Sequence, residues 1–94
     1  IWIYEYDNKI IAISTLIIQT KFIFNISYVG MIEDVFVDEN YRNKNIGKQM
    51  ILNLIEEAKK YNCYKIICVC LEHNKNFYIK CNFEHRGNFM SKLL

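Results

Sequence analysis

Apolar residues near the start of the chain form runs that are typical of β-strands. Residues 1–6 and 10–20 are rich in β-branched and aromatic side chains, and the polar turn Asp7–Lys9 separates them. This arrangement predicts a β-hairpin. A third apolar run, residues 31–37, follows Gly30, which we expect to permit a bend or a bulge. The N-terminal part of the chain therefore predicts an antiparallel sheet.

From Ile46 onward the apolar spacing changes to that of an α-helix, with apolar residues at 46, 50, 51, 54, 55 and 58. Residues 64–71 are almost wholly apolar, which predicts a strand covered on both faces. Residues 74–80 are long enough only for a short helix, and we expect a last strand over residues 83–94. The predicted order is β-β-β-α-β-α-β, an α/β fold.

The composition indicates a folded chain. Its 94 residues are 52% hydrophobic and 15% aromatic, which predicts one globular domain over residues 1–94. A core of this size leaves apolar surface uncovered, so we expect a homo-oligomer.

Charge and hydropathy exclude several partners. The net charge is +2 and the basic residues form no stripe, so we do not expect nucleic-acid binding. The longest apolar run, Ile10–Ile18, is about half of a membrane span, and no charged-then-apolar leader opens the chain. We therefore expect a cytoplasmic protein without a membrane span.

The four cysteines predict neither a disulfide framework nor a metal site. Cys68 and Cys70 are two residues apart on one expected strand, so their side chains point the same way. Their spacing to His73 and His85 fits no common zinc pattern. We expect reduced, packed thiols and no metal.

A polar loop, residues 38–48, joins the third predicted strand to the long helix. Backbone N–H groups at a helix start lack helical partners and lie at the positive end of the helix dipole. A pyrophosphate would therefore fit on residues 43–48, with added charge from Arg42, Lys44 or Lys48. A solvated loop before an ordinary helix has the same composition, so this segment alone leaves both interpretations open.

Four segments together carry more information than any one of them. They are GMIEDVFV (30–37), YRNKNIGK (41–48), NCYKI (62–66) and NFYIKCNF (76–83). In this order and spacing they resemble the GNAT family of acetyl-CoA-dependent N-acetyltransferases, over essentially the whole chain. The first and third segments are similar to the branch of the family that acts on glucosamine 6-phosphate. The resemblance implies a mixed, mostly antiparallel sheet with two splayed central parallel strands and flanking helices, and with the family's N-terminal elements missing here.

The resemblance also implies acetyl-CoA as the cofactor and coenzyme A as a product. Main-chain groups of residues 35–37 would bind the pantetheine arm and the thioester. Residues 43–48 would hold the pyrophosphate, and Tyr78 would approach the sulfur. The implied cofactor-binding set is Val35, Phe36, Val37, Arg42, Asn43, Lys44, Asn45, Ile46, Gly47, Lys48, Asn76 and Tyr78. Asn45 stands where the family usually has a glycine, but asparagine tolerates left-handed backbone angles.

The implied catalytic residues are Glu33, Asp34 and Tyr78. Glu33 and Asp34 would face the acceptor amine, and Asp34 or a water that it holds would take the proton, although neighbours in a strand face opposite sides. A solvated acidic pair, and an aromatic anchor at Tyr78, are the alternatives. The implied substrate-binding set is Lys21, Phe22, Ile23, Phe24, Glu33, Asp34 and Lys92. Val69 replaces an acidic residue that is common in the family.

The reaction implied is direct acetyl transfer to the amine of an amino-sugar phosphate, giving N-acetylglucosamine 6-phosphate for UDP-N-acetylglucosamine synthesis. The resemblance further implies a homodimer in which residues beyond Phe83 cross to the partner. Two alternatives stay open, because the cofactor-binding segments do not specify the acceptor. One is transfer to another amine, such as a protein N-terminus, a lysine or a polyamine. The other is a catalytically weak acetyl-CoA-binding module.

Overall fold

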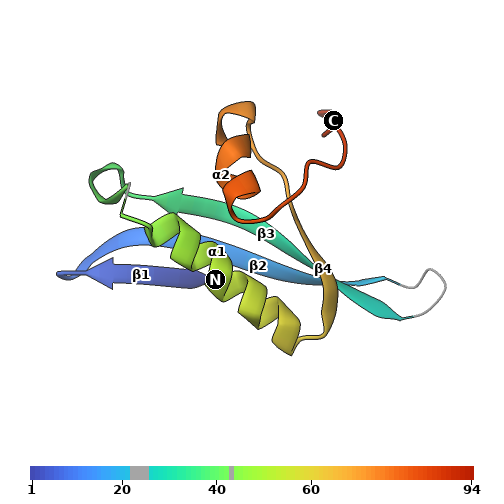
Figure 1. Cartoon of the computed structure of the whole chain (residues 1–94), viewed down its shortest axis with the longest axis horizontal. Coiled ribbons are helices and arrows are strands. Elements are labelled where there is room, and N and C mark those ends of the chain that lie inside the picture. The colour runs from blue at the N-terminus through green and yellow to red at the C-terminus, as the bar shows by residue number, and fades with distance from the viewer. Residues whose placement is uncertain (22–25, 43) are drawn as a thin grey trace.

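The computed structural model describes residues 1–21, 26–42 and 44–94 (Figure 1). Its elements are β1 (Trp2–Tyr6), β2 (Lys9–Lys21), β3 (Ser27–Val37), a 3-10 turn (Glu39–Tyr41), α1 (Ile46–Lys60), β4 (Cys63–Cys68), a second 3-10 turn (Glu72–Asn74) and α2 (Lys75–Lys80). This order confirms the prediction up to the short second helix. Within the described residues, no helix has the length and apolar character that crossing a membrane requires.

The described strands form a four-stranded sheet in the order β1-β2-β3-β4. The first two pairings are antiparallel and the pairing of β3 with β4 is parallel, which confirms the predicted mixed sheet. Asp7 and Asn8 connect β1 to β2 with left-handed φ values of 53° and 61°. Two consecutive left-handed residues match the right-handed twist of a hairpin, so the polar turn was a reliable signal.

The parallel strands β3 and β4 separate before β3 ends. Their pairing stops at Ile32 and Cys68, whereas β3 continues to Val37 and the chain after β4 turns away toward α2 (Figure 1). The predicted splay of two parallel strands is therefore present, although β4 lies at the edge of the described sheet. Among the described strands, residues 33–37 of β3 therefore have no partner on that side.

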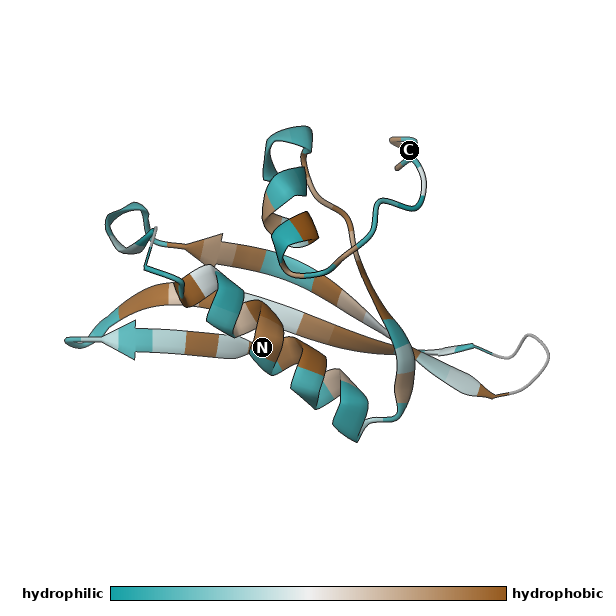
Figure 2. Cartoon of the chain, in the orientation of Figure 1, coloured by the Kyte–Doolittle hydropathy of each residue, from teal (hydrophilic) through white to brown (hydrophobic). Residues whose placement is uncertain are grey.

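Helix α1 covers one face of the sheet with its buried residues Met50, Ile51, Leu54 and Ala58. Figure 2 shows the mixed hydropathy of this helix against the largely hydrophobic β2 and β3. Gly30 lies under α1, where an added Cβ would be 3.4 Å from Ala58 Cβ and 3.2 Å from Leu16 Cδ1. Gly30 therefore permits close helix packing within a continuous strand, and the irregularity in the pairing of β3 with β4 falls just before it, between Tyr28 and Val29.

Two expectations about strands are wrong. The strand predicted over 64–71 ends at Cys68 and is not covered on both faces, since Tyr64 is 63% exposed and β4 lies at the sheet edge. The strand predicted over residues 83–94 is absent (Figure 1). A strand requires a neighbouring ladder, and this segment pairs with none of the described strands, so its apolar pattern alone does not make it one.

Candidate active site

Helix α1 follows a left-handed residue, and its first main-chain N–H groups have no partner within the helical ladder of the described residues. Asn45 precedes it with φ 62° and ψ 12°, which confirms that asparagine fits this position in place of glycine. The Gln49 amide donates to the Asn45 carbonyl at 3.0 Å, so the helical ladder accounts for Gln49 but not for the amides of residues 46–48. The first turn contains no acidic residue. These features suit an anion, and Asn43, predicted to share in the site, lies outside the described residues.

The three predicted cations of this loop differ in their surroundings. Arg42 turns back to the end of β3, where its Nε donates to the Val37 carbonyl at 3.1 Å. Lys44 Nζ lies 5.4 Å from the centre of the Tyr41 ring. Burial raises the pKa of the Cys81 thiol, and the positive charge of Lys48 partly opposes this shift.

Gly47 links three of the predicted cofactor segments. An added Cβ at Gly47 would lie 3.3 Å from Phe77 Cζ and 3.9 Å from Val37 Cγ2. The start of α1 therefore touches both the end of β3 and helix α2. The end of β3 at Val37, the start of α1 at Gly47 and Phe77 of α2 therefore lie close together, and a cofactor site on these segments stays a prediction.

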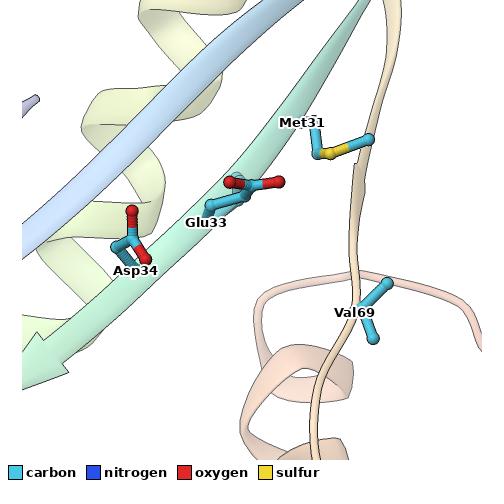
Figure 3. A pocket seen from close by; sticks show the side chains of 5 residues that line it. Met31, Glu33, Asp34 and Val69 are labelled. Atoms are coloured by element: carbon cyan, nitrogen blue, oxygen red, sulfur yellow. The ribbon is translucent and has the colours of Figure 1, made fainter. Parts of the chain in front are cut away.

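A pocket of about 260 Å³ opens between β3 and the chain that follows β4 (Figure 3). It is lined by Met31, Ile32, Glu33, Asp34 and Val69. Both carboxylates are exposed, and Val69 is 62% exposed. The pocket thus combines two acidic groups with apolar walls and lies directly beyond the last parallel pair.

Glu33 and Asp34 reach the same pocket because β3 contains a bulge. The pairing with β2 passes from Thr15–Glu33 to Ile13–Phe36, so one residue of β2 faces two residues of β3, and Asp34 has a φ of 54°. Ile32 and Val35, three residues apart, both pack against the core as a result. The expectation that neighbouring acids must face opposite sides was therefore wrong, since a bulge interrupts the alternation.

Tyr78 is a core residue of α2 whose hydroxyl lies near the end of β4. Its ring packs edge-on against Phe77 and Phe83, with centroid distances of 5.1 and 5.6 Å, and the residue is 9% exposed. Burial, followed by the nearby thiols of Cys68, Cys70 and Cys81, raises the pKa of Tyr78 to about 12. The hydroxyl is therefore a proton donor at neutral pH. Tyr78 does not line the acidic pocket.

The remaining predicted acceptor residues are not gathered at this pocket. Lys21 is the exposed last residue of β2 and pairs with Ser27, and Lys92 is exposed in the segment after Phe83. Phe22, Ile23 and Phe24 lie outside the described residues. Asn76, predicted for the cofactor, is exposed on α2.

Sequence reasoning missed two contributors to the site. Met31 lines the pocket, and its position two residues before Glu33 was an available signal, because alternate strand residues share a face. Phe77 contacts the start of α1, which no sequence spacing indicated. It lies within the recognised segment but was not singled out.

Comparison with known proteins places the chain in a family. Residues 1–83 match the acetyltransferase (GNAT) family, and the chain belongs to it. Among curated relatives, glucosamine 6-phosphate N-acetyltransferase 1 of Dictyostelium discoideum is 48% identical over 84 residues, which are 89% of this chain and 54% of the relative. Glucosamine 6-phosphate N-acetyltransferase of Schizosaccharomyces pombe is 39% identical over 92% of this chain and 78% of its own length.

A solved structure shares the fold. The glucosamine-6-phosphate N-acetyltransferase from Arabidopsis thaliana superposes with a TM-score of 0.87 at 40% identity, covering 92% of this chain and 58% of that protein. The chain therefore spans only about half of the first of these relatives, and somewhat more of the Arabidopsis protein.

Proposed function

We propose that this chain carries the acetyl-transfer site of a glucosamine 6-phosphate N-acetyltransferase. The reaction moves the acetyl group of acetyl-CoA directly to the sugar amine and gives N-acetylglucosamine 6-phosphate, a precursor for UDP-N-acetylglucosamine synthesis. The observation that carries the proposal is the convergence of residues 35–37, the start of α1 and α2 beside a pocket with two carboxylates. The similarity to named acetyltransferases of this substrate supports it.

The splay would hold the cofactor through main-chain groups. Residues 35–37 of β3 offer an unpaired strand edge to the pantetheine amides, and the free amides of residues 46–48 suit the pyrophosphate. Lys44 and Lys48 add positive charge there. When bound, acetyl-CoA supplies an acetyl group activated as a thioester, and its placement against the amine accounts for much of the rate.

The pocket carboxylates would bind the ammonium group of the acceptor and accept its proton. An amine attacks only in its neutral form, so a group must hold the ammonium and remove its proton. Glu33 and Asp34 are both exposed to the pocket and both accept hydrogen bonds when ionised. We assign Asp34, or a water that it orients, as the base.

Tyr78 would assist the departing thiolate. Its pKa of about 12 keeps the hydroxyl protonated, so the group is a donor throughout the neutral range. A donor near the sulfur interacts more strongly as negative charge develops there than it does with the bound thioester. The proposal is supported by the packing of Cys68, a member of the last parallel pair, against the core cluster that contains Tyr78.

A competition between acceptors tests the proposal. Glucosamine 6-phosphate, a lysine peptide and spermidine are each supplied with acetyl-CoA, and the acetylated product is measured by mass spectrometry. Release of free thiol is a poor readout here because the chain has four free cysteines. Preferred acetylation of glucosamine 6-phosphate supports the proposal. Preferred acetylation of the lysine peptide or of spermidine would show that the proposed acceptor is wrong. If coenzyme A binds but no acceptor is acetylated, the chain is a cofactor-binding module.

We also propose that two copies pair through the C-terminal segment. Phe89, Met90 and Leu93 are 71%, 88% and 96% exposed, and β4 presents a free edge at the end of the described sheet. An exposed strand edge and exposed apolar side chains are both stabilised by a partner. Sedimentation at about 50 μM should give a dimer, and a fully active monomer would contradict this part of the proposal.

The cytoplasm is the compartment we propose for this chain. All four cysteines are free, and Cys81 is buried among core residues. Free thiols persist in a reducing environment. Localisation by a fluorescent fusion in the source cell would test this, with a secretory pattern as the contrary result.

A further inference from the structure

Three of the five residues that line the pocket beside the splay are apolar, and the proposed chemistry uses only the two carboxylates. Ile32 belongs to the buried core, whereas Met31 is half-buried and Val69 is 62% exposed. An apolar side chain that faces water stabilises a complex when a ligand covers it. Met31 and Val69 therefore offer a bound acceptor an apolar surface, which we call the apolar wall.

The register of the parallel strands sets both side chains of the apolar wall on one side of the sheet. Ile32 pairs with Cys68, and Cys68 packs against the core cluster that contains Ile32. Because alternate residues of a strand face opposite sides, Met31 before Ile32 and Val69 after Cys68 face away from that core. Figure 3 shows Met31 reaching from β3 toward the chain that carries Val69, with the two carboxylates farther along β3. The pocket is thus apolar next to the last parallel pair and acidic at its other end.

This division of the pocket fits an amine whose ammonium lies beside a compact apolar surface. The carboxylates attract the ammonium, and the apolar wall covers C–H groups but offers no partner to a second charge. A pyranose ring presents such a C–H face next to an amine substituent, whereas an extended polyamine would place another ammonium against apolar side chains. The pocket volume of about 260 Å³ is below the roughly 300–1,000 Å³ that is typical for drug-sized ligands, and it therefore suits a single ring.

We propose that Met31 and Val69 determine acceptor specificity by packing against the C–H face of the amino-sugar ring while the pocket carboxylates hold its ammonium. The identity of the acceptor rests on the proposed function. Neither residue takes part in proton transfer or in bond making. Their contact with the ring is the same before and during the reaction, so their contribution belongs to the KM for the acceptor and not to kcat.

The kinetic test compares Met31→Ala with the matched variant Ile17→Ala. Ile17 pairs with Met31 and is 38% exposed, but it does not line the pocket. Met31→Ala should raise the KM for glucosamine 6-phosphate about tenfold, with kcat and the KM for acetyl-CoA within about twofold of the parent. Met31→Leu should restore the parent KM. The preference for glucosamine 6-phosphate over spermidine should fall in Met31→Ala and stay unchanged in Ile17→Ala.

A second pair of variants tests Val69. Val69→Thr replaces one methyl group by a hydroxyl at nearly constant volume, and Leu71→Thr introduces the same side chain at an exposed position outside the pocket. Val69→Thr should raise the KM for glucosamine 6-phosphate about threefold, because the wall becomes partly polar. Leu71→Thr should leave this KM unchanged.

NMR shows the contact directly and separates the two proposals. In the whole chain with coenzyme A and glucosamine 6-phosphate, the methyl groups of Met31 and Val69 should give nuclear Overhauser effects to the ring protons of the sugar. An unchanged acceptor KM in both Met31→Ala and Val69→Thr, or methyl effects that reach only the acetyl group of acetyl-CoA, would overturn the proposal. If the parent chain binds the sugar with these effects but does not acetylate it, the proposed function fails and the apolar wall stands.

Discussion

The cofactor side and the acceptor side of this site are built differently. On the cofactor side, Gly47 contacts Phe77, Arg42 is bonded to Val37, and α1 is anchored in the core. On the acceptor side, the carboxylates and Val69 are exposed around an open pocket, and Lys21 and Lys92, both predicted to bind the substrate, do not line it.

This difference follows from the groups that each ligand needs. Main-chain amides at a helix start and along a strand edge exist wherever the fold exists, whatever the side chains are. An acceptor, in contrast, is selected by particular side chains. We therefore expect that substitutions on the cofactor side abolish binding by disturbing the backbone, and that substitutions on the acceptor side change the rate or the selectivity.

Gly47→Val should have the largest effect. The added side chain must enter the space of the Phe77 ring, where a Cβ alone is already at 3.3 Å. Coenzyme A affinity, measured by calorimetry, should fall about 100-fold. Glu56→Val, on the exposed side of the same helix, controls for the lower helix propensity of valine. Equal affinities of Gly47→Val and the parent would show that the cofactor does not bind at this helix start.

Tyr78→Phe separates chemistry from binding. The substitution keeps the ring and its edge-on packing, and removes only the hydroxyl. Turnover should fall on the order of 10 to 1000-fold, with the KM for acetyl-CoA changed only a few-fold. Tyr64→Phe, at an exposed position on β4, is the matched control. Unchanged turnover in Tyr78→Phe would leave this residue a packing group.

Asp34→Asn should affect the acceptor side alone. Asparagine tolerates the left-handed backbone of this position, so the change removes charge without moving the bulge. The value of kcat/KM for the acceptor should fall about 10 to 100-fold while coenzyme A affinity stays constant. Asp7→Asn makes the same substitution at another left-handed residue, in the hairpin turn. A lower coenzyme A affinity in Asp34→Asn would contradict the proposal that the cofactor side and the acceptor side act separately.

Alkaline pH should reduce stability gradually. Burial raises the pKa of Cys68 from 9.0 to about 11 and that of Tyr78 from 10.0 to about 12. The folded state holds these protons more tightly than the unfolded state, so this contribution is fully present below about pH 9 and is lost as the pH rises toward 12. Urea unfolding should show a falling midpoint in this window, with a smaller fall in Tyr78→Phe. An identical pH dependence in Tyr78→Phe would show that Tyr78 does not contribute to the loss of stability at alkaline pH.

Local signals in the sequence predicted much of the fold. The apolar period after Ile46 gave α1 to within a residue or two, and the Asp7–Asn8 turn gave the first hairpin. The strand predicted over residues 83–94 is wrong because the apolar residues of this segment have no partner strand among those described. Its structure depends on contacts that a linear pattern does not contain.

The site was only partly predictable. Val37, Gly47 and Phe77, one from each of the three segments predicted to bind the cofactor, lie close together. The bulge at Asp34 was not foreseen, because it adds a residue without changing composition. Its one signal, the three-residue spacing of the core residues Ile32 and Val35, becomes meaningful only when both are known to face the core. Contacts such as Gly47 with Phe77 join residues 30 positions apart in sequence and depend on tertiary packing.

The most direct test of the account is a single NMR titration of the labelled chain with coenzyme A. The largest amide shift changes should fall on residues 35–37 and 44–48, with smaller changes at α2 and none in the groove between the end of α1 and residues 63–66. The opposite distribution, with the main changes in that groove and none at the start of α1, would contradict the placement of the cofactor at the splay.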